Sequence, residues 1–227
     1  MSAPEPLLDT VHRLLARTYR IEAGLAELAP FVIGDLGYRL LYGSRPPTRW
    51  IGESACAART LVREVGGAVH VRVYFPDALI RRLEQFPPQR GIGEPNVRAF
   101  ATFVEEIDHL LLIAERARQE RGVSLFELEL HANVSQHLVL ARFVAAADGA
   151  VGPAARGWLR RQLFDDTHDR RDEAPERARY REAVRQALRL IDALPALPPA
   201  ERLPLLRRFH AADCAAKLEL IDRCRAA

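Results

Sequence analysis

The sequence has little cysteine, one lysine, one methionine and no long apolar run. Cys56, Cys214 and Cys224 are an odd number without close spacing, which argues against a disulfide framework and against a cysteine-based zinc site. No apolar stretch approaches the roughly 20 residues that a membrane-spanning helix needs. The first residues, MSAPEPLLDT, lack the basic and apolar regions of a secretory signal. These absences predict a cytoplasmic protein with reduced thiols and no membrane partner.

Basic residues are abundant, but almost all of them are arginine. Lys217 is the only lysine among 33 basic residues, which stand against 30 acidic residues and give a net charge of +3. Arginine is interleaved with glutamate and aspartate, as in DDTHDRRDEAPERARYRE, and does not form one patch. Nucleic-acid binding depends on clustered Lys and Arg side chains that neutralise phosphates. We therefore expect no nucleic-acid partner.

The hydrophobic pattern predicts a mostly α-helical protein with a small antiparallel β element in an α+β N-terminal part. The stretch AVHVRVYF at 68–75 alternates valine with polar residues, as a half-buried strand does. We expect 31–43 to contain its partner strand and 54–62 to form a helix. Asp77 is placed to cap a further helix over 78–86.

Long helices are predicted after 86–96, a stretch rich in proline and glycine. Apolar residues then repeat at helical spacing, which indicates a helical bundle with four or five long helices. We treat 1–227 as a single domain, with a mixed α+β part over 1–90 and the bundle over 96–227. The predicted helices are 5–29 in the N-terminal part and then 97–120, 124–147, 153–166, 174–195 and 199–226.

The most informative motif is the Glu-x-x-His of Glu106 and His109, within FVEEIDHLLL. Bundle proteins use this spacing to hold iron or manganese. On a helical wheel centred on Ile107, Glu106 lies at the edge of the apolar arc, whereas Glu105 and His109 lie nearly opposite Ile107. The pair is therefore on the surface, or its helix is buried on two sides. A surface pair of this kind stabilises a helix by only about 0.2–0.5 kcal/mol.

The next helix brings a further ligand near this motif. The short link around Gly122 predicts an antiparallel hairpin between the two helices. In that register His137 lies beside Glu106, whereas His131 lies one to two turns from the pair. The compact candidate site for iron or manganese is therefore Glu106, His109 and His137.

A fourth ligand is sought on the last predicted helix, where His210 shares a face with apolar residues. The alternative is a buried histidine that pairs with Asp213 or Glu219 at a helix–helix contact. Ferritin-like di-iron and di-manganese bundles use a second Glu-x-x-His, which this sequence lacks. Glu127 is assigned a structural role, because Ser124 and Glu127 have the spacing of a capping box.

Two functions fit these observations. The first is a non-catalytic cytosolic protein that acts through protein–protein binding or self-association, since no nucleotide loop, nucleophile elbow or basic patch is present. For this function Trp50 and Arg49, on a proline-rich loop, are the candidate binding residues. The alternative is a metal-binding helical-bundle oxidoreductase of the di-iron or manganese carboxylate type, which uses Glu106, His109 and His137. We favour the first.

Overall fold

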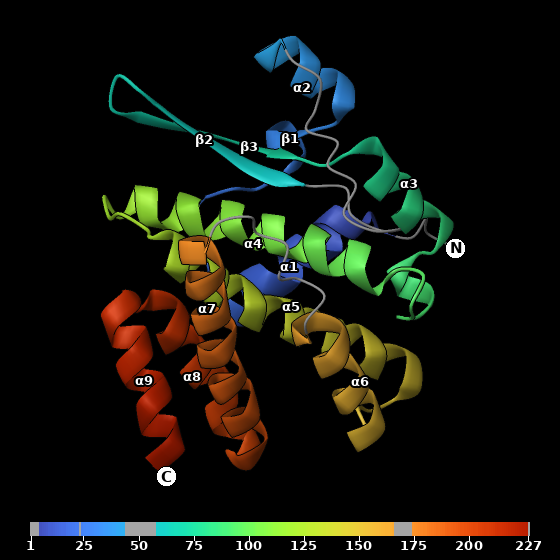
Figure 1. Ribbon diagram of the computed structural model, residues 1–227, viewed down its shortest axis with the longest axis vertical. Coiled ribbons are helices and arrows are strands. Elements are labelled where there is room, and N and C mark those ends of the chain that lie inside the picture. Colours follow the sequence, from blue (N-terminus) through green and yellow to red (C-terminus); the bar gives the residue numbers. More distant parts are fainter. Residues whose placement is uncertain (1–4, 23, 44–57, 166–173, 227) are drawn as a thin grey trace.

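The computed structural model describes residues 5–22, 24–43, 58–165 and 174–226. It confirms a mostly helical chain with a small sheet near the N-terminus (Figure 1). None of the described helices combines the length and apolarity needed to cross a bilayer. The helices are α1 (Leu7–Tyr19), α2 (Asp35–Tyr42), α3 (Asp77–Gln85), α4 (Val97–Arg118), α5 (Leu125–Asp148), α6 (Pro153–Phe164), α7 (Ala174–Ala193), α8 (Pro199–Ala211) and α9 (Cys214–Ala226), and the strands are β1 (Val32–Ile33), β2 (Arg59–Val65) and β3 (Ala68–Tyr74).

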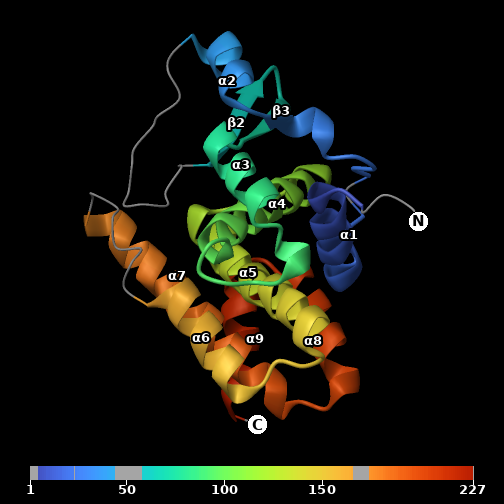
Figure 2. The same cartoon turned by 90° about the vertical axis from the view of Figure 1, so that its right-hand side faces the viewer.

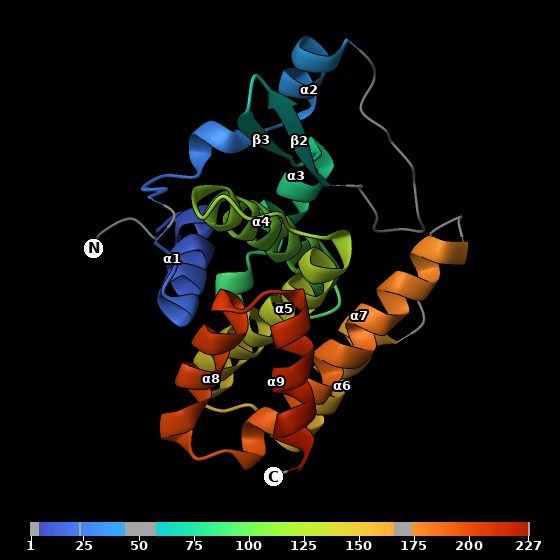
Figure 3. The same cartoon turned by 90° about the vertical axis from the view of Figure 1, so that its left-hand side faces the viewer.

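The elements stack around a central hairpin made of α4 and α5 (Figures 1 and 2). The sheet, α2 and α3 lie on one side of this hairpin, and α6, α7, α8 and α9 lie on the other. Helix α1 packs along one flank, where it contacts α4, α5 and α8 (Figure 3). Both α4 and α5 are therefore covered on more than one side, which explains why their polar residues are frequently buried.

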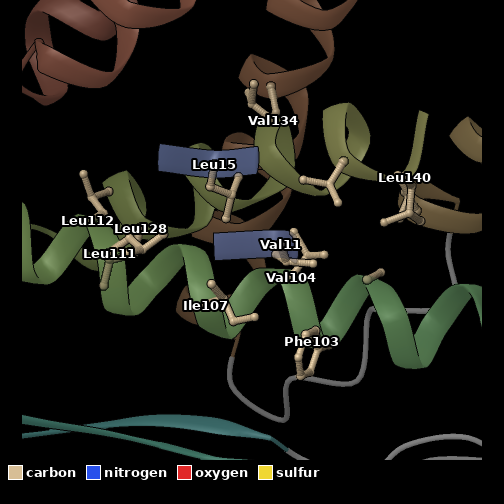
Figure 4. Close-up of a cluster of buried hydrophobic side chains, with 14 of the residues drawn as sticks. Val11, Leu15, Phe103, Val104, Ile107, Leu111, Leu112, Leu128, Val134 and Leu140 are labelled. Carbon is tan, nitrogen blue, oxygen red and sulfur yellow. The ribbon is translucent and has the colours of Figure 1, made fainter. Parts of the chain in front are cut away.

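The core gathers between α1 and the two central helices (Figure 4). Val11 and Leu15 lie one turn apart on α1 and are 0% and 1% exposed. They lie close to Val104 and Ile107 of α4, and Val134 of α5 completes this layer. Burying a side chain of this size stabilises the fold by about 1.5–3 kcal/mol. The N-terminal helix is thus an integral part of the bundle.

The structure confirms the strand predicted at 68–75, but the segments predicted on either side of it differ from expectation. The strands are ordered β1-β3-β2, and β2 pairs antiparallel with β3 over its whole length. The helix predicted for 54–62 is therefore wrong over the residues that the structure describes. Thr60 and Val62 are β-branched residues that favour a strand. Gly66–Gly67 closes the hairpin with positive φ at both residues, as a two-residue turn requires.

The segment 31–43 contributes only the two residues of β1 to the sheet, and β1 pairs with β3 in parallel. Most of the remaining residues form α2, from Asp35 to Tyr42. Asp77 Oδ1 accepts a hydrogen bond of 3.1 Å from the Asp35 N–H, and Asp35 Oδ1 accepts one of 3.3 Å from the Asp77 N–H. Asp77 therefore binds the start of α2, and the role predicted for it as the cap of α3 is wrong because it is already the first residue of that helix.

Two predicted helices are shorter than expected. The helix predicted for 5–29 ends at Tyr19, because Arg20 adopts a left-handed conformation with φ 59°. The helix predicted for 199–226 is broken before Asp213. The Asp213 Oδ1 atom accepts a hydrogen bond of 2.9 Å from the N–H of the third residue of α9, so this side chain caps a new helix.

Candidate functional site

The α4–α5 hairpin has the register that the link around Gly122 predicts, to within one residue. Ser135 Oγ donates to Asp108 Oδ1 at 2.6 Å. One turn from the link, Arg116 Nη2 donates to Glu127 Oε1 at 2.9 Å. This register determines which polar side chains of the two helices meet.

The structure does not bring the predicted ligands together. Glu106 faces the sheet, and its Oε2 atom accepts a hydrogen bond of 2.7 Å from Thr60 Oγ. His109 Nδ1 lies 3.7 Å from Glu106 Oε2, so this pair of the motif does form. His137 instead stacks on Phe164 of α6, with ring centroids 6.4 Å apart. Burial lowers the pKa of His137 to about 4, so it is a neutral side chain packed between helices.

The other predicted site residues fall elsewhere. His210 lies on α8, where its Nδ1 atom is 3.1 Å from His131 Nε2. It belongs to a different cluster from Glu106 and His109. Trp50 and Arg49 lie outside the described residues.

A different set of ligands meets between α4 and α5. Glu105 and His109 lie one turn apart on α4, and Glu129 reaches them from α5. Each offers one ligand atom, and these three atoms lie within 4.8 Å of one another. Within the described part of the chain, no other group of three or more His, Cys, Asp or Glu side chains has this spacing. We call it the Glu–His–Glu cluster.

The imidazole of His109 lies among carboxylates. Its side chain is only 12% exposed, and burial alone would lower its pKa. The negative charges of Glu106, Glu105 and Glu129 outweigh burial and raise the pKa of His109 to about 9. Its Nε2 atom is buried and has no hydrogen-bond partner among the described residues. The cluster therefore concentrates negative charge around a ring nitrogen that is able to bind a cation once its proton is lost.

Asn133 adds a buried polar atom on the same face of α5. It lies one turn after Glu129, is 2% exposed, and donates from Nδ2 to the Glu129 carbonyl at 2.7 Å. Its Oδ1 atom is buried and has no hydrogen-bond partner within the described ranges. Gln136, further along this face, donates to the Glu105 carboxylate at 3.0 Å. Buried polar atoms are normally hydrogen-bonded, so Asn133 Oδ1, one turn along α5 from Glu129, is a candidate for a further ligand atom.

A second polar cluster, the buried network, joins α1, α4, α5 and α8. Tyr19 Oη and Ser135 Oγ are 2.7 Å apart, and Ser135 donates to Asp108. His131 Nδ1 lies 2.8 Å from the Asp108 carboxylate, and His131 Nε2 lies against His210. All five residues of this network are at most 4% exposed. A substrate has no access to them, so the network holds helices together.

The charge state of the buried network follows from its surroundings. Burial alone would raise the pKa of Asp108, but His131 and Ser135 outweigh burial and lower it. Burial lowers the pKa of His131, and it lowers that of His210 to about 3. Asp108 is therefore charged and both imidazoles are neutral at pH 7. This assignment makes His131 donate from Nδ1 to the carboxylate and accept at Nε2 from His210.

A third cluster surrounds Glu127, whose predicted role is half correct. Ser124 Oγ accepts a hydrogen bond of 3.1 Å from the Glu127 N–H, which confirms the N-cap. The Glu127 carboxylate does not complete the capping box, because it accepts hydrogen bonds from Arg116 and Lys217. Lys217, the only lysine of the chain, is 0% exposed. This buried ion triad is structural.

Sequence reasoning missed two members of the Glu–His–Glu cluster. The helical wheel places Glu105 beside His109, and that shared face is the signal that could have found it. Glu129 carries no comparable signal, because it is one acidic residue in the alternating stretch FELEL at a helix start.

Comparison with protein-family models, with curated proteins and with solved structures finds no match for this chain. Its function is therefore inferred from the chemistry of its own residues.

Proposed function

We propose that this chain binds one divalent transition-metal ion between α4 and α5, with Glu105, His109 and Glu129 as ligands. The observation that supports this is the spacing of the three ligand atoms, all within 4.8 Å of one another. Nitrogen and oxygen ligands bind such ions at about 2.0–2.2 Å, which puts the ligand atoms around one ion about 3–4 Å apart. The 4.8 Å limit is wider than that spacing, so metal binding would draw the three ligand atoms closer together.

The ligand types narrow the choice of metal. One imidazole and two carboxylates, without a thiolate, suit Mn²⁺, Fe²⁺ or Zn²⁺. Three protein ligands leave a coordination position for water or a substrate, as in catalytic zinc sites. Three protein ligands are too few to hold two ions, so we favour a mononuclear centre over the di-iron type. Iron or manganese would support redox chemistry, and zinc would support activation of a bound water.

The charge of the cluster also favours a cation. Glu105, Glu106 and Glu129 all raise the pKa of the His109 imidazole, so a cation at this place is attracted by several carboxylates. A divalent ion would displace the proton of His109 and bind the ring nitrogen that lacks a hydrogen-bond partner within the described residues.

The metal content of the purified protein tests the proposed function. Untagged protein loaded in turn with Mn²⁺, Fe²⁺ or Zn²⁺ and then dialysed should retain about one ion per chain of at least one metal. His109→Ala and Glu129→Gln should each weaken binding by about 100-fold or more, because each removes a ligand. Elemental analysis by mass spectrometry gives the stoichiometry, and circular dichroism checks that each variant folds.

His137→Ala is the matched control, because this histidine lies on α5 outside the cluster and packs on Phe164. It should keep wild-type metal content. The proposal would be wrong if His137→Ala lost the metal while Glu129→Gln kept it. It would also be wrong if the folded wild-type protein retained none of the three metals.

We also propose that the chain binds a partner protein, which is compatible with metal binding. We expect both functions to be those of a cytoplasmic protein. Among the described residues, seven of the nine large hydrophobic side chains that are exposed lie on α2 and on the β2–β3 hairpin. Their exposed fractions run from 44% to 76%. Exposed apolar groups that gather at one end of a molecule are typical of interaction surfaces. They are Leu36, Leu40, Leu41, Tyr42, Val62, Val65 and Val69.

A further inference from the structure

Strand β2 is an edge of the sheet. It is seven residues long and is paired with β3 on one side, from Arg59 opposite Tyr74 to Val65 opposite Ala68. Its other side has no strand neighbour in the described part of the chain. In an antiparallel pair, part of the N–H and C=O groups of an edge strand point away from its neighbour. This edge is therefore able to take up another strand.

The two faces of β2 differ in chemistry. Thr60 points toward α4, where it donates to Glu106, so Val62 shares this inner face because side chains alternate along a strand. Val62 is 54% exposed, since the hairpin is not covered there. Arg59 and Arg63 lie on the opposite, outer face and are exposed. Glu64 also shares the inner face, and Leu61 shares the outer face with the two arginines. A strand added at this edge would meet a basic outer face and an inner face that is apolar at Val62.

Neither β2 nor β3 contributes a carboxylate to the outer face; Asp35 of α2 reaches its end, where it accepts a hydrogen bond of 2.8 Å from Tyr74. In the β2–β3 register Leu61 lies opposite Arg72, and Arg63 lies opposite His70. Arg59, Arg63 and Arg72 form no ion pair with any carboxylate among the described residues. A face with three arginines and no acidic side chain from its own two strands attracts a negatively charged partner.

Chemistry decides between the candidate partners. A second copy of β2 is disfavoured, because a two-fold pairing keeps the outer faces together and would double the positive charge on one face. Single-stranded nucleic acid is disfavoured, because it needs exposed aromatic rings for stacking, and the Tyr74 side chain on this face is buried. An extended acidic peptide satisfies both the open edge and the charge.

We propose that β2 binds an extended segment of a partner protein in which acidic residues alternate with apolar residues. The segment adds to the edge as a further strand and forms backbone hydrogen bonds with β2. Its acidic side chains lie on the outer face beside Arg59 and Arg63. Its apolar side chains lie on the inner face beside Val62.

A defined peptide tests this binding. The probe is a fluorescein-labelled peptide of alternating glutamate and valine, titrated with the full chain in EDTA so that the outcome is independent of metal. Fluorescence anisotropy should show saturable binding. The double variant Arg59→Glu/Arg63→Glu should weaken it about tenfold, because each reversal replaces an attraction with a repulsion. Amide hydrogen exchange should slow in 59–65 on saturation and stay unchanged in α7.

The matched control is Arg142→Glu/Arg207→Glu, which makes the same charge change at exposed arginines on α5 and α8. It should bind the probe like wild type. If this control lost peptide binding to the same extent, the loss would be explained by net charge alone, and the proposal would be overturned. Equal binding of a lysine–valine peptide, or no binding at about 1 mM, a weak-complex concentration, would overturn it too. So would tighter binding of a single-stranded oligonucleotide, or a dimer that Arg59→Glu/Arg63→Glu dissociates.

Discussion

Replacing Glu127 by alanine is expected to lower the free energy of unfolding by about 3–5 kcal/mol, because it leaves two buried cations without a counter-charge. The carboxylate accepts hydrogen bonds from Arg116 Nη2 at 2.9 Å and from Lys217 Nζ at 2.7 Å. All three side chains are at most 4% exposed. Urea unfolding followed by circular dichroism measures the loss.

The same two cations hold the end of α8. Arg116 Nη2 donates to the carbonyl oxygens of His210 and Ala212, at 2.8 and 2.7 Å. Lys217 Nζ donates to the Ala212 carbonyl at 2.6 Å. Carbonyl groups at a helix C-terminus lack intrahelical donors and carry partial negative charge, so cations stabilise them. Glu127→Ala should therefore also speed amide hydrogen exchange at the α8–α9 turn.

Glu127→Gln is the control that separates charge from shape. Burial alone would raise the pKa of Glu127, but the hydrogen bonds and charges of Lys217 and Arg116 outweigh burial and lower it. A carboxyl group with a lowered pKa stabilises the fold above its unfolded-state pKa, and this contribution is lost as the pH falls through the folded-state pKa. The stability difference between wild type and Glu127→Gln should therefore be largest near neutral pH and shrink in acid. A loss below about 1 kcal/mol for Glu127→Ala would contradict the role of the triad.

Asp108→Ala is the second large effect, with an expected loss of about 3–4 kcal/mol in the free energy of unfolding. The variant leaves the Ser135 hydroxyl and the His131 Nδ1–H without their acceptor in a closed interior. An unsatisfied buried donor costs about 1–3 kcal/mol. The loss should appear in urea unfolding as a shifted midpoint with an unchanged slope.

Two conservative variants should lower the free energy of unfolding by smaller amounts than Asp108→Ala does. Tyr19→Phe removes only the hydroxyl that meets Ser135 and should cost about 1 kcal/mol. Asp108→Asn keeps the shape and one acceptor, so its loss should lie between those of Tyr19→Phe and Asp108→Ala. A different order, or an Asp108→Ala protein as stable as wild type, would show that the buried network does not hold α1 and α8 on the central hairpin.

The helices and β3 were predictable because their signals are local. Apolar spacing located α4 and α5, and alternating valines located β3. The helix predicted at 54–62 missed a local signal of the same kind, since Gly66–Gly67 between two stretches rich in β-branched residues is a hairpin turn. The break before Asp213 was harder to predict, because the apolar pattern continues through it.

The polar clusters were only partly predictable, because their partners are distant in sequence. The helical wheel correctly placed His109 on the side of α4 away from Ile107. Of the two options it left open, a surface pair or a helix buried on two sides, the structure confirms the second. No local pattern reports that His131 meets His210, which is 79 residues away, or that Lys217 meets Glu127. These contacts depend on how α8 and α9 pack against the α4–α5 hairpin.

The most direct test of the proposed metal site is an anomalous difference map from crystals grown with Mn²⁺ or Zn²⁺. We predict one strong peak between α4 and α5, about 2.0–2.3 Å from a His109 nitrogen and from carboxylate oxygens of Glu105 and Glu129. A peak at another group of ligands, or no peak in crystals of the folded protein, would contradict the site.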